Sequence, residues 1–77
     1  MRYYFHIRDG ETLIEDPDGE EFITIDAARE EALLAARELL AKRVIAGEIL
    51  DGQKFEIRDQ AGELHATVPF KDALRLG

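Results

Sequence analysis

The sequence contains no cysteine and no serine, and its six glycines are scattered singly. Without cysteine the chain has no disulfide framework, no thiolate nucleophile and no cysteine-ligated zinc or iron–sulfur site. Isolated glycines exclude a glycine-rich phosphate-binding loop. The hydroxyl groups belong to threonines and tyrosines, and no threonine lies in a recognisable nucleophile motif. We therefore predict a protein that is not an enzyme, with no catalytic residues and no cofactor.

Basic residues and long apolar runs are also scarce. Ten basic residues stand against seventeen acidic ones, so the formal net charge is −7. Nucleic acids and anionic membranes are bound through an excess of positive charge, so this balance disfavours both as main partners. The apolar run at residues 32–36 is far shorter than a membrane span, and the N-terminal apolar stretch is too short for a signal peptide. We expect a cytoplasmic protein.

The length of 77 residues fits one domain, and we assign residues 1–77 to it. A chain of this size buries only about 60% of the surface that it exposes when unfolded. The core is therefore thin, and association with a second copy is one route to further stability.

Hydrophobic periodicity predicts the fold class. Apolar and polar residues alternate at 3–8 and at 54–59, and each strand is followed by a turn and a returning strand, at 12–15 and 63–68. A helix is expected from residue 27 to about 46, with Asp26 as its N-cap and Gly47 as its stop. Residues 20–24 add at most a brief extended piece. We predict an α+β, two-layer sandwich of order ββαββ, with one long helix packed on a mostly antiparallel sheet.

Two stretches of the chain echo each other, FHIRD at residues 5–9 and FEIRD at residues 55–59. An old duplication of a hairpin would produce this echo. Two strand–turn–strand units that need similar residues would produce it too. Both explanations support two hairpins that flank one helix.

Acidic residues are concentrated between positions 9 and 31, where Arg29 is the only basic residue. The motif Asp16-x-Asp18-Gly19 is similar to part of a calcium loop, but Ile14 and Ile25 occupy positions where that loop needs ligands. Turn chemistry and a helix start explain most of these acids, and we predict no metal site. A docking surface for a basic partner is the functional alternative.

The outward face of the sheet carries our candidate binding residues. Strand alternation places six side chains there: Tyr4, His6, Arg8, Glu56, Arg58 and His65. Arginines beside an aromatic ring are typical of sheets that stack single-stranded nucleic acid. The simpler interpretation is a solvated face stabilised by cross-strand pairs, such as Glu56 with an arginine.

The two histidines of the chain have a separate chemical interpretation. If the two terminal strands are neighbours, His6 and His65 approach each other, and with Glu56 they could carry out acid–base chemistry or hold a metal. An open sheet face, however, offers no pocket that excludes water. We therefore interpret both as ordinary residues of a polar face.

The helix has two apolar stripes. The wider one faces the sheet and contains Ala32, Leu33, Ala36, Leu39, Leu40 and Val44. The narrower one, formed by Leu34, Ala41 and Ile45, lies on roughly the opposite side and is not needed by a lone two-layer domain. Burial of this stripe in a self-complementary homodimer is one interpretation, and a scatter of exposed apolar residues is the other.

The opening string RYYFHIRDG, the helix start at 26–29 and the stretch TVPFKDA at 67–73 resemble a family of short bacterial proteins of unknown function. Such proteins are common in alphaproteobacteria, especially the rhizobial group, and the resemblance covers essentially the whole chain. It implies a free-standing cytoplasmic bacterial protein and brings no activity.

The sequence therefore favours a small non-enzymatic protein-interaction or regulatory module that acts as a homodimer or on another protein. The alternative is a nucleic-acid-binding module that uses the outward sheet face.

Overall fold

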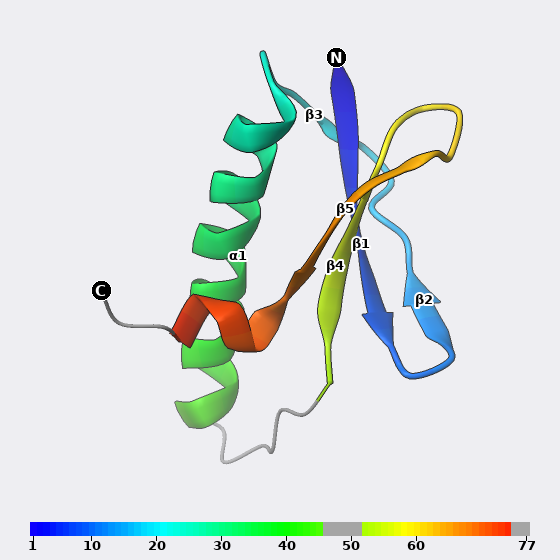
Figure 1. The fold of residues 1–77 in the computed structure, drawn as a ribbon. Helices are drawn as coiled ribbons and strands as arrows, with labels where there is room; N and C mark the ends of the chain where they lie inside the picture. The colour runs from blue at the N-terminus through cyan, green and yellow to red at the C-terminus, as the bar shows by residue number, and fades with distance from the viewer. Residues whose placement is uncertain (46–51, 75–77) are drawn as a thin grey trace.

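The computed structural model describes residues 1–45 and 52–74, which form one helical layer against one sheet (Figure 1). In chain order the elements are β1 (Arg2–Asp9), β2 (Thr12–Ile14), β3 (Glu20–Glu21), α1 (Ile25–Ile45), β4 (Lys54–Arg58), β5 (Leu64–Pro69) and the 3-10 helix η1 (Phe70–Leu74). The predicted α+β class is confirmed, with one long helix on a mostly antiparallel sheet. The order differs in one respect, because the brief extended piece is a strand, β3, that pairs with β1.

The sheet has the order β2-β1-β4-β5, and β3 pairs with β1 as well. The two echoing stretches are therefore direct neighbours, since β1 and β4 pair in antiparallel fashion. Phe5 lies opposite Ile57, and Ile7 lies opposite Phe55. The echo thus places the same pattern of apolar side chains on both central strands, and it is centred on the pair formed by His6 and Glu56.

The core lies between α1 and the sheet, and η1 packs against the helix (Figure 1). Small residues at every fourth position of α1 let its backbone lie close to the strands. The wider apolar stripe is confirmed for its described members, because Ala32, Ala36 and Leu40 are buried while Leu33 and Leu39 are partly buried against them. The side chain of Val44 lies outside what the structure describes. The remaining core side chains are Tyr3, Ala28, Phe55, Ile57, Val68, Phe70 and Ala73.

The start of α1 differs from the sequence-based prediction. The Oγ1 of Thr24 accepts a hydrogen bond of 3.1 Å from the backbone N–H of Ala27, so Thr24 is the N-cap. Asp26 lies inside the first turn instead. The predicted stop, Gly47, lies outside the described residues. No helix within residues 1–45 and 52–74 is long and apolar enough to cross a membrane.

The hairpin of β4 and β5 contains an irregularity that redirects one histidine. The strand register shifts by one residue between Ile57 and Arg58, so that Ile57 lies opposite Ala66 but Arg58 lies opposite Leu64. His65 is left over, as in a β-bulge. Alternation gave the wrong sides here, since Leu64, predicted to face the core, is 46% exposed. His65 is exposed as well, but its ring packs edge-on against the buried Tyr3, with ring centroids 5.4 Å apart.

Candidate functional site

Glu56 is the centre of the outward sheet face. It is buried, with 7% of its surface exposed, and it is the only buried charged residue among those that the structure describes. Its Oε2 accepts a hydrogen bond of 2.9 Å from Nε of Arg8, and its Oε1 accepts one of 2.9 Å from Nη2 of Arg58. The predicted cross-strand pair of Glu56 with an arginine is confirmed, and the two guanidinium groups together satisfy both carboxylate oxygens.

The charges of this cluster are strongly coupled. The hydrogen bond from Arg8, helped by the one from Arg58, outweighs the effect of burial and lowers the pKa of Glu56 to about 2. The same hydrogen bond raises the pKa of Arg8 above its ordinary value. Glu56 is therefore ionised across the physiological pH range, which makes it a structural anion rather than a proton donor.

The same pairing limits what the outward face can bind. Tyr4 and His6 do stack there, with ring centroids 6.1 Å apart and an interplanar angle of 18°. However, Glu56 already neutralises one of the two guanidinium charges and occupies hydrogen-bond donors of both arginines. Fewer donors remain for a phosphate than the sequence pattern suggests.

His6 and Asp16 are joined at the edge of β1. The backbone N–H of Asp16 donates a hydrogen bond of 2.9 Å to Nδ1 of His6, which fixes that nitrogen as the acceptor. The carboxylate of Asp16 accepts bonds from the backbone N–H groups of Phe5, Asp18 and Gly19. Burial raises the pKa of Asp16, but the hydrogen bonds from the N–H groups of Phe5, Gly19 and Asp18 together outweigh burial. The pKa of Asp16 therefore lies below its ordinary value.

The six residues of the predicted face do not form one cluster. β4 lies between β1 and β5, so the two terminal strands are not neighbours and the condition for an approach of His6 to His65 is not met. The bulge also turns His65 to Tyr3, away from the position that alternation gave it. Tyr4, His6, Arg8, Glu56 and Arg58 remain together on neighbouring strands.

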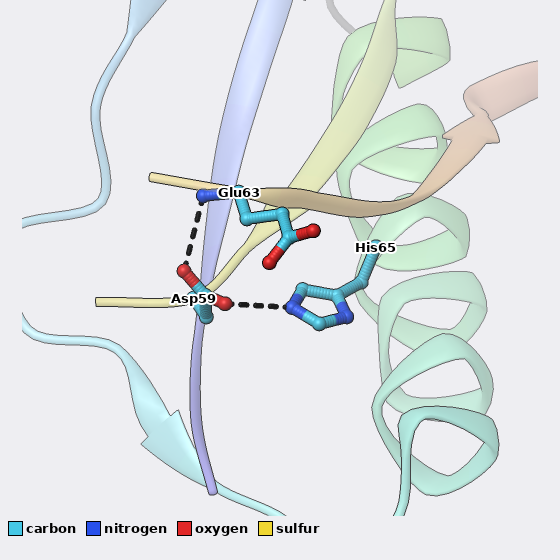
Figure 2. A group of neighbouring side chains, drawn as sticks. All are labelled: Asp59, Glu63 and His65. Carbon is cyan, nitrogen blue, oxygen red and sulfur yellow. Dashed lines mark hydrogen bonds and ion pairs between the residues drawn. The ribbon is translucent and has the colours of Figure 1, made fainter. Parts of the chain in front are cut away.

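His65 instead lies close to the carboxylates of Asp59 and Glu63, which belong to the turn between β4 and β5 (Figure 2). Its Nε2 lies 2.8 Å from Oδ2 of Asp59. The other oxygen of Asp59, Oδ1, accepts bonds of 2.9 Å from the N–H of Ala61 and 3.0 Å from the N–H of Glu63. The hydrogen bond with His65 lowers the pKa of Asp59 below its ordinary value, and the N–H of Glu63 acts in the same direction.

The carboxylate of Glu63 completes this group. One ligand atom from each of Asp59, Glu63 and His65 lies within 4.8 Å of the others, and Figure 2 shows the three side chains turned toward a common point. Sequence reasoning missed Asp59 and Glu63 as site residues. Asp59 could have been noticed in the sequence, because an aspartate at the start of a tight turn often binds backbone N–H groups. The bulge that brings His65 close to Asp59 could not, because the alternation of apolar and polar residues does not reveal it.

The described residues of the narrower helix stripe are exposed to solvent. Leu34 is 51% exposed and Ala41 is exposed, whereas the side chain of Ile45 lies outside what the structure describes. Ala27 is also exposed, and it lies seven residues before Leu34, as Ala41 lies seven after it. This spacing places all three on one line along the helix.

Residues 2–71 match the sequence family DUF6894, a domain of unknown function, and the chain belongs to this family. The chain has no significant match among curated proteins or solved structures.

Proposed function

We propose that this domain is a small, non-enzymatic protein-interaction module that binds its partner with the solvent-facing side of α1. The observation that carries the proposal is the half-exposed Leu34, in line with the exposed Ala27 and Ala41. Small residues on either side of one larger apolar side chain allow a partner helix to approach closely along that line. A helix that only covered its own sheet would need no such line.

The charges around Leu34 favour a basic partner. Within one turn on either side of it, α1 exposes Glu30, Glu31 and Glu38 but only one base, Arg37. The whole chain carries a formal net charge of −7, so two copies repel each other at low salt. A partner segment with apolar residues flanked by lysine or arginine fits this surface better than a second copy does.

The nucleic-acid alternative is less well supported. Its expected contact residues include Arg8 and Arg58, and both donate hydrogen bonds to Glu56. The stacked Tyr4 and His6 are the remaining feature in its favour.

The test compares two equally exposed apolar residues. Leu34 is 51% exposed on α1 and Ile14 is 50% exposed on β2, so Leu34→Glu and Ile14→Glu are matched variants. Affinity capture from an alphaproteobacterial lysate, the source that the sequence resemblance indicates, is run with and without nuclease. We expect a nuclease-resistant partner that Leu34→Glu loses, that Ile14→Glu retains, and whose binding weakens as salt is raised.

Other outcomes contradict parts of the proposal. Equal capture by both variants removes α1 as the interface. A nuclease-sensitive partner favours the outward sheet face. Sedimentation equilibrium of the purified chain gives the self-association state, and a dimer that Leu34→Glu dissociates shows that the stripe binds a second copy.

A further inference from the structure

We propose that Asp59, Glu63 and His65 form a binding site for a divalent transition-metal ion of the Zn²⁺ type. The inference is independent of the proposed function, since Asp59 and Glu63 lie in the turn between β4 and β5 and His65 lies in β5, not on α1. An imidazole nitrogen with two carboxylate oxygens is a donor set that Zn²⁺ and its neighbours accept. Two negative charges also match the charge of a dication.

Two of the three ligands are held in place before any ion arrives. Backbone N–H groups of Ala61 and Glu63 bind one oxygen of Asp59, which leaves Oδ2 directed toward His65. The ring of His65 is fixed from the other side by its edge-on contact with Tyr3, at an interplanar angle of 82°. Supporting contacts of this kind orient metal ligands in known sites. The bulge that turns His65 out of the regular register is therefore what assembles the group.

The third ligand is the adjustable one. Glu63 is exposed, and in the part of the chain that the structure describes its carboxylate makes no hydrogen bond or ion pair. In a tetrahedral zinc site with bonds of about 2.0–2.2 Å, the ligand atoms lie about 3.3–3.6 Å apart. The three atoms here lie within 4.8 Å of one another, so the exposed Glu63 side chain has to rotate and bring its carboxylate about 1 Å closer.

The ion replaces the hydrogen bond between Nε2 of His65 and Oδ2 of Asp59, which lie 2.8 Å apart. Nε2 then gives its lone pair to the metal, and the Nδ1–H tautomer is the one that binds. The neighbouring cation, Arg58, already donates to Glu56 and to the carbonyl oxygen of Gly62. Three protein ligands leave the remaining coordination positions to solvent.

Calorimetric titration of the full, tag-free chain with ZnCl₂ near neutral pH tests the site. We expect one ion per chain, and at least a tenfold loss of affinity in both Glu63→Gln and His65→Gln. Glu15→Gln removes an exposed carboxylate elsewhere, and His6→Gln removes the other histidine of the chain. Both controls should bind zinc as the wild type does. Since Glu63 is exposed, Glu63→Gln keeps the test decisive even if His65→Gln does not fold.

Three results would overturn the site. They are no binding to the wild type at millimolar zinc, wild-type affinity in Glu63→Gln, or an equal loss in a control variant. Amide NMR spectra with substoichiometric Mn²⁺ locate the ion independently. Broadening confined to residues 59–65 and Tyr3 supports the assignment, and broadening centred on residues 15–21 contradicts it.

Discussion

The carboxylate of Glu56 on β4 is hydrogen-bonded at 2.9 Å to the guanidinium of Arg8 on β1, and it is buried while doing so. The two residues are 48 positions apart, so this pair links the first strand to the half of the chain that follows the helix. Arg58, two residues after Glu56 on β4, donates a hydrogen bond to the same carboxylate. Because a buried charge is costly without partners, the two arginines are a condition for the central strand pair to form as it does.

We predict that Glu56→Gln lowers the free energy of unfolding at pH 7 by about 1–3 kcal/mol, since hydrogen bonds to a charged group are replaced by weaker ones and two guanidinium groups lose their counter-charge. Urea denaturation of both proteins measures the difference. A value near zero would show that the arginines find other partners at no cost.

The pH dependence of that difference is a second prediction. The pKa of Glu56 is about 2 in the folded chain and near the ordinary 4.5 in the unfolded one. A lowered pKa contributes stability that is fully present above the unfolded value and is lost as pH falls through the folded value. The gap in unfolding free energy between wild type and Glu56→Gln should therefore shrink between pH 4.5 and pH 2. A constant gap over that range would mean that the carboxylate charge is not what stabilises the pair.

Gly19 allows a third prediction. It has a φ of +68°, and a Cβ there would lie 2.8 Å from Cε2 of Tyr4. Gly10 also has a positive φ, +61°, but open space around it. Both Gly10→Ala and Gly19→Ala should lower the free energy of unfolding by about 1–2 kcal/mol, because alanine is strained in the left-handed backbone conformation. Only Gly19→Ala also displaces the tyrosine ring, so thermal denaturation should show a clearly larger loss for it. Equal losses would mean that Tyr4 moves aside freely.

The strand faces were predictable where the two-residue period is uninterrupted. On β1 and β4 the alternation placed Tyr3, Phe55 and Ile57 on the core side, and all three are buried. The period fails at the bulge, because one extra residue reverses the facing of every side chain beyond it. His65 and Leu64 were therefore assigned to the wrong sides.

The partners of Glu56 and His65 could not be derived in full. Alternation put Glu56 and arginines on one face, but it does not give the register that sets Arg8 diagonally across from Glu56. The meeting of His65 with Asp59 depends on the bulge and on a tight turn held by backbone hydrogen bonds. Such contacts depend on three-dimensional register, which local residue patterns do not encode.

Asp16 provides a fourth prediction, because its carboxylate replaces a missing strand partner. Residues 15–19 lie between β2 and β3, which both pair with β1, and in this gap Oδ2 of Asp16 accepts a hydrogen bond of 3.2 Å from the N–H of Phe5. In Asp16→Ala the amide of Phe5 loses that acceptor and should exchange with solvent markedly faster by hydrogen-exchange NMR. Asp18→Ala is the control, since the side chain of Asp18 is exposed and only its backbone takes part in the turn. Unchanged protection of Phe5 would show that water or another group serves it equally well.

The start of α1 gives the last prediction, and it separates two neighbouring residues. Thr24 caps the helix through a hydrogen bond to the N–H of Ala27, so Thr24→Ala should lower the free energy of unfolding by about 1 kcal/mol. Asp26 acts only through its charge near the positive end of the helix, worth about 0.3–1 kcal/mol at low salt, and Asp26→Asn removes that charge. Because salt screens a charge effect but leaves a cap hydrogen bond nearly intact, the loss in Asp26→Asn should fade when denaturation is repeated in high salt. The loss in Thr24→Ala should persist. A larger, salt-independent loss in Asp26→Asn would instead make Asp26 the residue on which the first turn depends.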